Sequence, residues 1–293
     1  MHTINIEKAI EEKKRVAFWS VLAAVFITGG KMVVGIITGS LGILSEALHS
    51  GLDFVAAAIT YFTVRVSDKP ADENHPFGHG KYENLSAFIQ TILLFITCIW
   101  IIYEAIQRFI DVKPIEVNHW SYIVVIGSII IDYTRSRALK KAAKKHNSQA
   151  LEADALHFST DIWSSFVVLI GLITANFGWF WADSAAALIV AFIVIVVAYK
   201  LGKRSIDVLL DRTSVESRQK VIEIISGIPQ VLDYHNLKIR TSGAYTFVEV
   251  NIHLDSKLTI EEAHDISHKV ETLICENIEK CKVHVHEEPN NSH

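Results

Sequence analysis

Cysteine, proline and methionine are scarce in this chain of 293 residues, which contains three, five and two of them respectively. The three cysteines show no C-x-x-C spacing, and one lies in an apolar run and two in the C-terminal part of the chain, so we expect reduced thiols. The N-terminal stretch MHTINIEKAIEEKKR lacks the apolar core of a cleaved secretory signal. A formal net charge of −4, without any basic-aromatic stretch, excludes nucleic acid as the expected partner.

Apolar residues, in contrast, are abundant. They make up 50% of the chain, and the mean hydropathy of +0.29 is high for a soluble domain. Several apolar runs approach the length of about 20 residues that a helix needs to cross a bilayer. We expect the fourth helix to continue through Asp132 and the fifth to begin near Ser148. Six transmembrane helices are predicted around residues 17–38, 41–66, 85–106, 120–131, 158–173 and 185–201.

Basic residues predict the orientation of these helices. Lysines and arginines occupy positions 13–15, and six more lie between 135 and 145 with no acidic residue among them. By the positive-inside rule both segments face the cytoplasm, and an even number of spans returns the C-terminus to the same side. The sequence therefore predicts a multi-pass protein of the cell (inner) membrane with both termini cytoplasmic. Lys31, inside the first span, is expected to extend toward the interface.

The character of the chain changes near Val208. Apolar and polar residues alternate from Phe247 to Leu254, as in a half-buried strand, and Thr259 with Glu262 forms a capping box that opens a helix. The predicted order is α-β-β-α-β, with helices at about 216–226 and 259–278 and strands at 237–241, 247–254 and 282–287. The expected domains are a cytosolic segment (1–16), a six-helix transmembrane domain (17–207) and a cytosolic α+β domain that binds metal (208–293).

Two octets in the predicted spans resemble each other: EALHSGLD at 46–53 and DALHFSTD at 154–161. Each contains a histidine and an aspartate at i, i+4, which lie one turn apart on one helix face: His49 with Asp53, and His157 with Asp161. Ionisable groups inside a membrane are costly and mark a site or pathway. If the two helices meet, four nitrogen and oxygen ligands with a total charge of −2 suit a tetrahedral divalent ion such as Zn²⁺.

An alternative is that each histidine is only hydrogen-bonded between helices, with the aspartate as its partner. Duplication of the octet favours the metal site. Glu46 and Asp154, three residues before each histidine, either support the ligands or face water at a helix end.

Two further histidine groups lie outside the predicted spans. Asp72, His75 and His79 fall within DKPADENHPFGHGKYE, where proline and glycine prevent a helix, so this loop could fold around an ion or be an ordinary polar loop. After residue 230, His284, His286 and Glu288 share one strand face and His264 lies one turn before His268. His235, His253 and His293 complete seven histidines there, which favours metal binding over a merely polar surface.

These features together resemble the cation diffusion facilitator family, in its prokaryotic zinc/iron efflux type. The resemblance rests on the two H-x-x-x-D pairs, the loop sequence HPFGHGKYE, six spans and the cytosolic α-β-β-α-β domain, and covers nearly the whole chain. It implies a homodimer that exports a divalent metal in exchange for protons, with a metallochaperone-like (ferredoxin-like) tail domain that binds metal and tightens the dimer.

The family resemblance also assigns residues. It implies a transport site at His49, Asp53, His157 and Asp161, a loop site at Asp72, His75 and His79, and a tail site at His235, His264, His286 and Glu288. Lys81 and Asp211 are implied to form a charge interlock at the dimer. One departure is Asn251, which stands where well-studied bacterial members have a further histidine ligand. The tail site is therefore incomplete, weaker, or rebuilt with His253 or His284.

Ligand chemistry narrows the cargo and the mechanism. Two imidazoles favour Zn²⁺ over harder cations, while Fe²⁺, Co²⁺, Ni²⁺ and Cd²⁺ also suit nitrogen and oxygen sites. Metal binding needs neutral histidine and ionised aspartate, so protons and metal compete for one site. Two other functions stay open: a non-transporting metal-binding or sensor subunit, for which the loop and tail would suffice, and an intramembrane metalloenzyme. The enzyme is disfavoured because the chain has no H-E-x-x-H motif and no separate general base.

Overall fold

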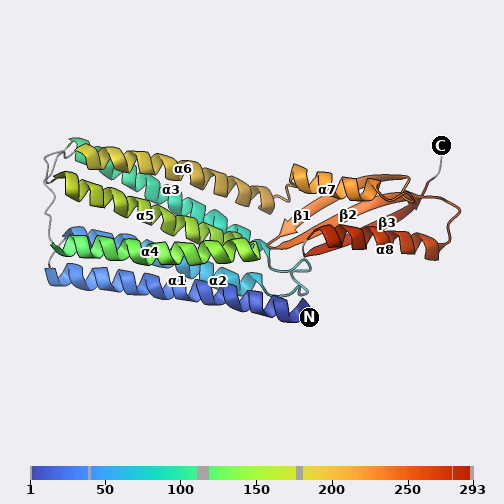
Figure 1. Cartoon of the computed structure of the whole chain (residues 1–293), viewed down its shortest axis with the longest axis horizontal. Helices are drawn as coiled ribbons and strands as arrows, with labels where there is room; N and C mark the ends of the chain where they lie inside the picture. Colours follow the sequence, from blue (N-terminus) through green and yellow to red (C-terminus); the bar gives the residue numbers. More distant parts are fainter. Residues whose placement is uncertain (1, 39–40, 111–118, 176–180, 279, 291–293) are drawn as a thin grey trace. The chain divides into compact units, whose positions relative to one another are not determined.

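The computed structural model describes residues 2–38, 41–110, 119–175, 181–278 and 280–290 (Figure 1). The chain forms two compact units. The first consists of Met1–Lys69 and Tyr82–Ser205, and the second of Pro70–Lys81 and Ile206–His293. The second unit therefore includes a segment, Pro70–Lys81, that lies between the two parts of the first unit in the sequence.

Six long helices make up the first unit, as the apolar runs predict. The fourth helix passes through Asp132 and the fifth begins one residue after Ser148, both as expected. The helices are α1 (His2–Thr38), α2 (Leu41–Ser67), α3 (Lys81–Ile110), α4 (His119–His146), α5 (Gln149–Ala175) and α6 (Trp181–Leu209).

Small residues allow four of these helices to pack closely. The most extensive pairings join α1 to α2 and α4 to α5, while α1 also contacts α4 and α2 contacts α5. Their shared core is rich in alanine, including Ala17, Ala57 and Ala155, and small residues at helix interfaces let backbones approach. Helices α3 and α6 pack through a separate cluster that includes Leu94 and Val194.

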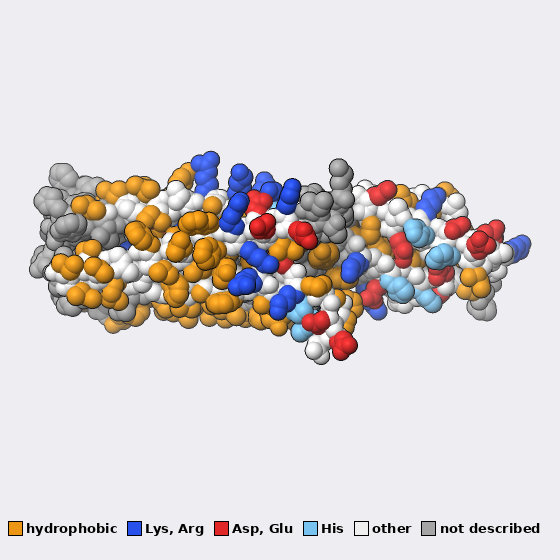
Figure 2. Space-filling view, turned by 90° about the horizontal axis from the view of Figure 1, so that it is seen from below, with side chains coloured by type: hydrophobic (Ala, Val, Ile, Leu, Met, Phe, Trp, Pro, Cys, Tyr) orange, Lys and Arg blue, Asp and Glu red, His pale blue; other side chains and the backbone are white. Residues whose placement is uncertain are grey.

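Large apolar side chains cover the outside of this unit. Phe26, Phe62, Ile99 and Phe192 are all exposed, and Figure 2 shows hydrophobic side chains over much of the helical surface. An exterior with so many large apolar side chains matches a lipid environment. Among the described residues, α1 and α3 contain continuous segments long and apolar enough to cross a membrane.

The second unit has the predicted α-β-β-α-β order. In the three-stranded sheet β1 pairs with β2 antiparallel and β2 with β3 parallel, the latter through the crossover helix α8. Its elements are α7 (Val215–Ser226), β1 (Asp233–Ser242), β2 (Tyr245–Leu254), α8 (Ile260–Asn277) and β3 (Cys281–Pro289).

Alternation along β2 separates a core face from a polar face. Val248, Val250, Ile252 and Leu254 are buried in one cluster with residues of α7 and α8. Because successive strand residues point to opposite faces, Asn251 and His253 lie on the side away from this core.

The segment Pro70–Lys81 packs on the β1–β2 hairpin. Phe77 lies edge-on to Phe247, with ring centroids 5.4 Å apart, and the Arg240 guanidinium lies 3.6 Å from the centre of the Phe77 ring. Gly80 sits against the hairpin turn so closely that a Cβ there would come within 2.4 Å of the Ser242 carbonyl oxygen. Glycine is therefore required at position 80 for this contact.

The capping box of α8 gives a test of the tail fold. The Thr259 hydroxyl accepts from the Glu262 backbone amide, and the Glu262 side chain accepts from the Thr259 amide, which lowers the Glu262 pKa. Thr259→Ala should destabilise α8 by about 1 kcal/mol. Hydrogen exchange of the α8 amides in the intact protein should accelerate about fivefold. Ser256→Ala, in the same exposed loop, is the control; equal exchange in both variants would contradict the role of the cap.

Candidate metal centres

The first candidate centre lies inside the helical unit, where α2 meets α5. Asp53, His157 and Asp161 are all buried, and one ligand atom from each lies within 4.8 Å of the others. His157 Nε2 is 3.0 Å from Asp53 Oδ1 and 3.9 Å from Asp161 Oδ2. The structure thus brings together three of the four residues predicted from the repeated octets.

His49, the fourth predicted ligand, belongs to α2 one helical turn before Asp53. Its side chain lies outside the described part of the structure, as does that of Glu46. The helical phase of α2 alone places His49 on the same helix face as Asp53.

More charge is buried around this centre than the sequence indicated. Asp132, Arg135 and Asp154 are all nearly inaccessible, with Asp154 at 0% exposure. On the sequence alone, Arg135 groups with the basic residues of a cytoplasm-facing segment. In the structure, Arg135 lies within α4 and is buried inside the bundle. Lys31 does not extend to the interface as expected, since it is buried and its Nζ donates to Ser50 Oγ at 3.0 Å. The i, i+3 spacing of Asp132 and Arg135 at the end of an apolar run was the sequence feature that could have indicated this buried ion pair.

The second candidate centre is formed by Asp72, His75 and His79 in the segment that packs on the hairpin. Their ligand atoms also lie within 4.8 Å of one another. Asp72 Oδ1 is 3.2 Å from His75 Nδ1, and Asp72 Oδ2 is 3.4 Å from His79 Nε2. The backbone amide of His75 donates to Asp72 and holds the pKa of that carboxyl below its usual range. Asp72 is therefore ionised at neutral pH.

A backbone contact orients His79 for ligation. Its Nδ1 lies 3.2 Å from the Pro70 carbonyl oxygen, which can only accept a hydrogen bond. Nδ1 therefore carries a proton, which leaves Nε2 on the side of the Asp72 carboxylate, 3.4 Å from Oδ2. A cation bound here would contact His79 Nε2 and Asp72 Oδ2 together.

The third candidate centre lies on the polar face of the sheet. His235, His253 and Glu288 have ligand atoms within 4.8 Å of one another, with His253 Nε2 3.1 Å from His235 Nδ1. Strand pairing explains the grouping, because β2 sets His253 opposite Glu288 and Asn251 between His235 and His286. The Asn251 amide donates to Glu288 Oε1 at 2.7 Å. Asn251 thus holds a predicted ligand by hydrogen bonding.

The remaining predicted tail ligands are less closely placed. His286 Nε2 is 3.8 Å from Glu288 Oε1, so it borders the group. His264 is exposed on α8, beside His268, and the described residues of one chain do not bring it into the group. On the sequence alone, His253 is considered only as a replacement for the histidine missing at position 251. In the structure, His253 lies within the group, beside His235 and Glu288.

Lys81 and Asp211 form an ion pair within one chain, with Lys81 Nζ 2.7 Å from Asp211 Oδ1. Lys81 Nζ also lies 3.5 Å from the Leu209 carbonyl oxygen. Asp211 adopts a left-handed backbone conformation with φ of 57°. The pair thus connects the start of α3 to the chain just after α6.

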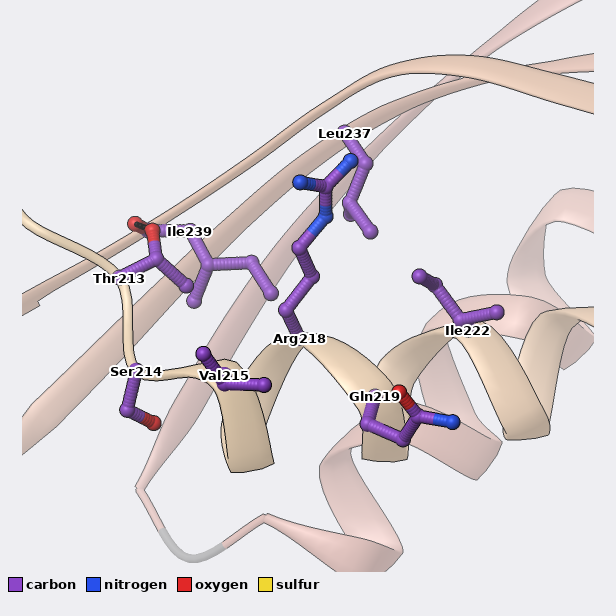
Figure 3. A pocket seen from close by; sticks show the side chains of 8 residues that line it. All are labelled: Thr213, Ser214, Val215, Arg218, Gln219, Ile222, Leu237 and Ile239. Carbon is purple, nitrogen blue, oxygen red and sulfur yellow. Dashed lines mark hydrogen bonds between the residues drawn. The ribbon is translucent and has the colours of Figure 1, made fainter.

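A pocket in the second unit is not a metal centre. It lies between α7 and β1 and has Arg218 as its one charged lining residue (Figure 3). None of its lining residues is a histidine, cysteine or carboxylate: Thr213, Ser214, Val215, Arg218, Gln219, Ile222, Leu237 and Ile239.

Comparison with known proteins agrees with this architecture. Residues 17–210 match the cation efflux transmembrane domain, and residues 214–290 match the cation efflux protein cytoplasmic domain. The chain is 30% identical to the cation-efflux pump FieF of Shewanella oneidensis over 271 residues, which cover 92% of each chain. It is 34% identical over 258 residues to an uncharacterised transporter of Methanocaldococcus jannaschii, covering 87% of this chain and 91% of that relative.

A solved structure is similar to part of this chain. The metal-bound C-terminal domain of the CzcD transporter from Thermotoga maritima is 25% identical, covers 28% of this chain and 98% of its own, and has a TM-score of 0.26. The matches to the transmembrane and cytoplasmic domains of the family, over residues 17–210 and 214–290, span most of the sequence and confirm the family resemblance. The chain belongs to the cation efflux family, the cation diffusion facilitators, and is a membrane transporter of divalent metal cations rather than an enzyme.

Proposed function

We propose that this transporter exports Zn²⁺ from the cytoplasm in exchange for protons, by alternating access of a site formed by His49, Asp53, His157 and Asp161. The observation that supports the proposal most directly is the convergence of Asp53, His157 and Asp161 in a buried position between two helices. His49 completes a set of two imidazoles and two carboxylates. Such a set matches the tetrahedral coordination that Zn²⁺ adopts.

The contact between His157 and Asp53 supports proton exchange. At 3.0 Å, an imidazole nitrogen and a carboxylate oxygen must share a proton, since two lone pairs would repel. A metal ion that binds His157 Nε2 has to displace that proton. Metal and proton are therefore mutually exclusive at one atom. We propose that the cytoplasm-facing site loads the ion, and that protonation from the opposite side releases it.

The proposed cargo follows from the ligand atoms of the site. Imidazole nitrogen favours Zn²⁺ over Mg²⁺ or Ca²⁺, which prefer oxygen alone. Fe²⁺, Co²⁺, Ni²⁺ and Cd²⁺ suit the same donors and are proposed as secondary cargo. A non-transporting sensor subunit is the alternative, and the loop and tail centres would be sufficient for metal binding by such a subunit. The buried site favours transport, because a sensor has no need of ligands inside the bundle.

The loop and tail centres fit regulatory metal binding. In the loop, Asp72 is ionised and His79 presents Nε2 toward it. In the tail, we propose that His235, His253 and Glu288 bind the ion with His286 at the border. His264 remains a proposed ligand without support from the structure of one chain.

We propose a homodimer in the cell (inner) membrane, with both termini cytoplasmic. The match of residues 214–290 to the family's cytoplasmic domain supports a dimer. The ion pair between Lys81 and Asp211 is proposed as the charge interlock at the membrane face of that dimer. The proposed domains remain 1–16, 17–207 and 208–293.

Loss of a buried ligand is the first test of this function. His157→Ala and Asp161→Asn should each reduce zinc flux in proteoliposomes by roughly 100-fold or more, because even groups that only support a metal ligand cost about 10–100-fold. His268→Ala, exposed on α8 and assigned to no site, serves as the control and should transport like the wild type. Substantial flux in both ligand variants would contradict a site at this position.

Proton exchange can be tested with an imposed pH gradient. An acidic lumen should accelerate zinc uptake by molecules whose cytoplasmic side faces outward, since protons from the lumen displace the ion at release. A protonophore should return uptake to the rate measured at equal pH. Identical uptake with and without the gradient would rule out the exchange.

The tail site predicts opposite effects of two substitutions. Asn251→His should tighten zinc binding by about tenfold or more, because it adds an imidazole beside His235, whereas His253→Ala should weaken it on the same scale. Both can be measured on the purified full-length protein by competition with a chromophoric chelator. His268→Ala, on exposed α8, is the control. Unchanged binding in His253→Ala would remove that residue from the site.

A further inference from the structure

Arg135 makes four contacts inside the bundle. Its Nε and one terminal nitrogen donate to Ser20 Oγ of α1 at 3.3 and 3.2 Å, and the other terminal nitrogen donates to Asp132 Oδ1 at 3.4 Å. Its guanidinium also lies 3.4 Å from the centre of the Phe158 ring. Phe158 is fully buried and directly follows His157. The arginine therefore contacts α1, its own helix and the turn of α5 that carries His157.

Asp154 lies at the other end of this chain of contacts. It is fully buried on α5, three residues before His157, and accepts the Ser20 hydroxyl proton at 3.1 Å. Ser20 thus receives hydrogen bonds from Arg135 and gives one to Asp154. The Ser20 hydroxyl of α1 therefore lies between the positive charge of Arg135 on α4 and the negative charge of Asp154 on α5, and it joins the three helices.

The charges of this group act on the proposed transport site. The Arg135 guanidinium interacts electrostatically with Asp154, Asp161 and Asp53. A buried carboxylate without compensation would be strongly destabilising. Six charged side chains of the described residues gather here, four acidic and two basic, so their formal charges leave −2: Asp53, Asp132, Asp154, Asp161, Lys31 and Arg135. That value is balanced by one dication.

We infer, on the basis of the proposed function, that Arg135 and Asp154 are positioning residues that set the zinc affinity of the site through their fixed charges. Asp154 adds attraction for a dication and Arg135 subtracts from it. A transported ion must bind well enough to enter and weakly enough to leave. Arg135 thus keeps a site surrounded by carboxylates from retaining its ion, while its stacking on Phe158 orients the helix turn of His157.

The charge cycle of these two residues tests the inference. Arg135→Gln should lower the apparent KM for zinc in proteoliposomes by about tenfold and lower kcat, since the ion leaves more slowly. Asp154→Asn should raise the KM by about tenfold, because one attractive charge is lost. The double variant should return the KM to within about threefold of the wild type, since the two changes cancel.

Two further variants distinguish charge from packing. Arg135→Lys keeps the positive charge but loses the stacking on Phe158, so its KM should lie closer to the wild-type value than that of Arg135→Gln. Arg137→Gln, exposed on the same helix, should leave the KM unchanged. A KM that rises in both single variants and rises further in the double variant would overturn the inference, as purely structural damage produces that result. If Arg135→Gln does not fold, an unchanged KM in Asp154→Asn still overturns it. Failure of the proposed function would appear separately, as absence of wild-type zinc flux.

Discussion

The burial of carboxylates in an apolar helical bundle is the constraint on which the rest of this structure depends. Asp53 and Asp161 cannot remain charged among alanine and phenylalanine side chains unless a cation or a proton accompanies them. The bundle answers this in two ways. His157 Nε2 lies 3.0 Å from Asp53 Oδ1, where the two groups can share a proton, and Arg135 and Lys31 bring positive charge to the same region. The alanine-rich contacts between helices let these groups come close enough to compensate one another.

The cytosolic sheet gathers similar side chains under a weaker constraint. His235, His253 and Glu288 are only half-buried, so water compensates them when no ion does. Their convergence follows from strand register, which aligns residues of three strands on the polar face while the alternate positions fill the core. Binding there costs little desolvation, which suits an equilibrium with cytoplasmic metal. In the proposed mechanism, the buried site instead takes up protons that replace the charge of each ion that leaves.

Periodicity made most of this architecture predictable. Helical spacing predicted that Asp53 shares a helix face with His49, and Asp161 with His157, while their convergence depended on contact between the two helices. Strand alternation with the Thr259 capping box predicted the tail fold. Side-chain direction between distant segments was not predictable. Arg135 looked like a cytoplasmic loop charge because no local pattern records that Ser20 and Asp154, both far away in sequence, face it. The same holds for His253, whose role depends on the register of β1 and β3, and for the packing of Phe77 on Arg240.

Exchangeable and fixed charges have different consequences for a transporter. In the proposed exchange, the proton between His157 and Asp53 occupies the atom that a metal ion needs, so it leaves and returns in each cycle. The guanidinium of Arg135 cannot lose its proton in a protein, so it contributes the same potential in every state. A site built only from exchangeable charges would bind its ion as tightly as its carboxylates allow. A fixed cation among those carboxylates lowers that limit without occupying a ligand position.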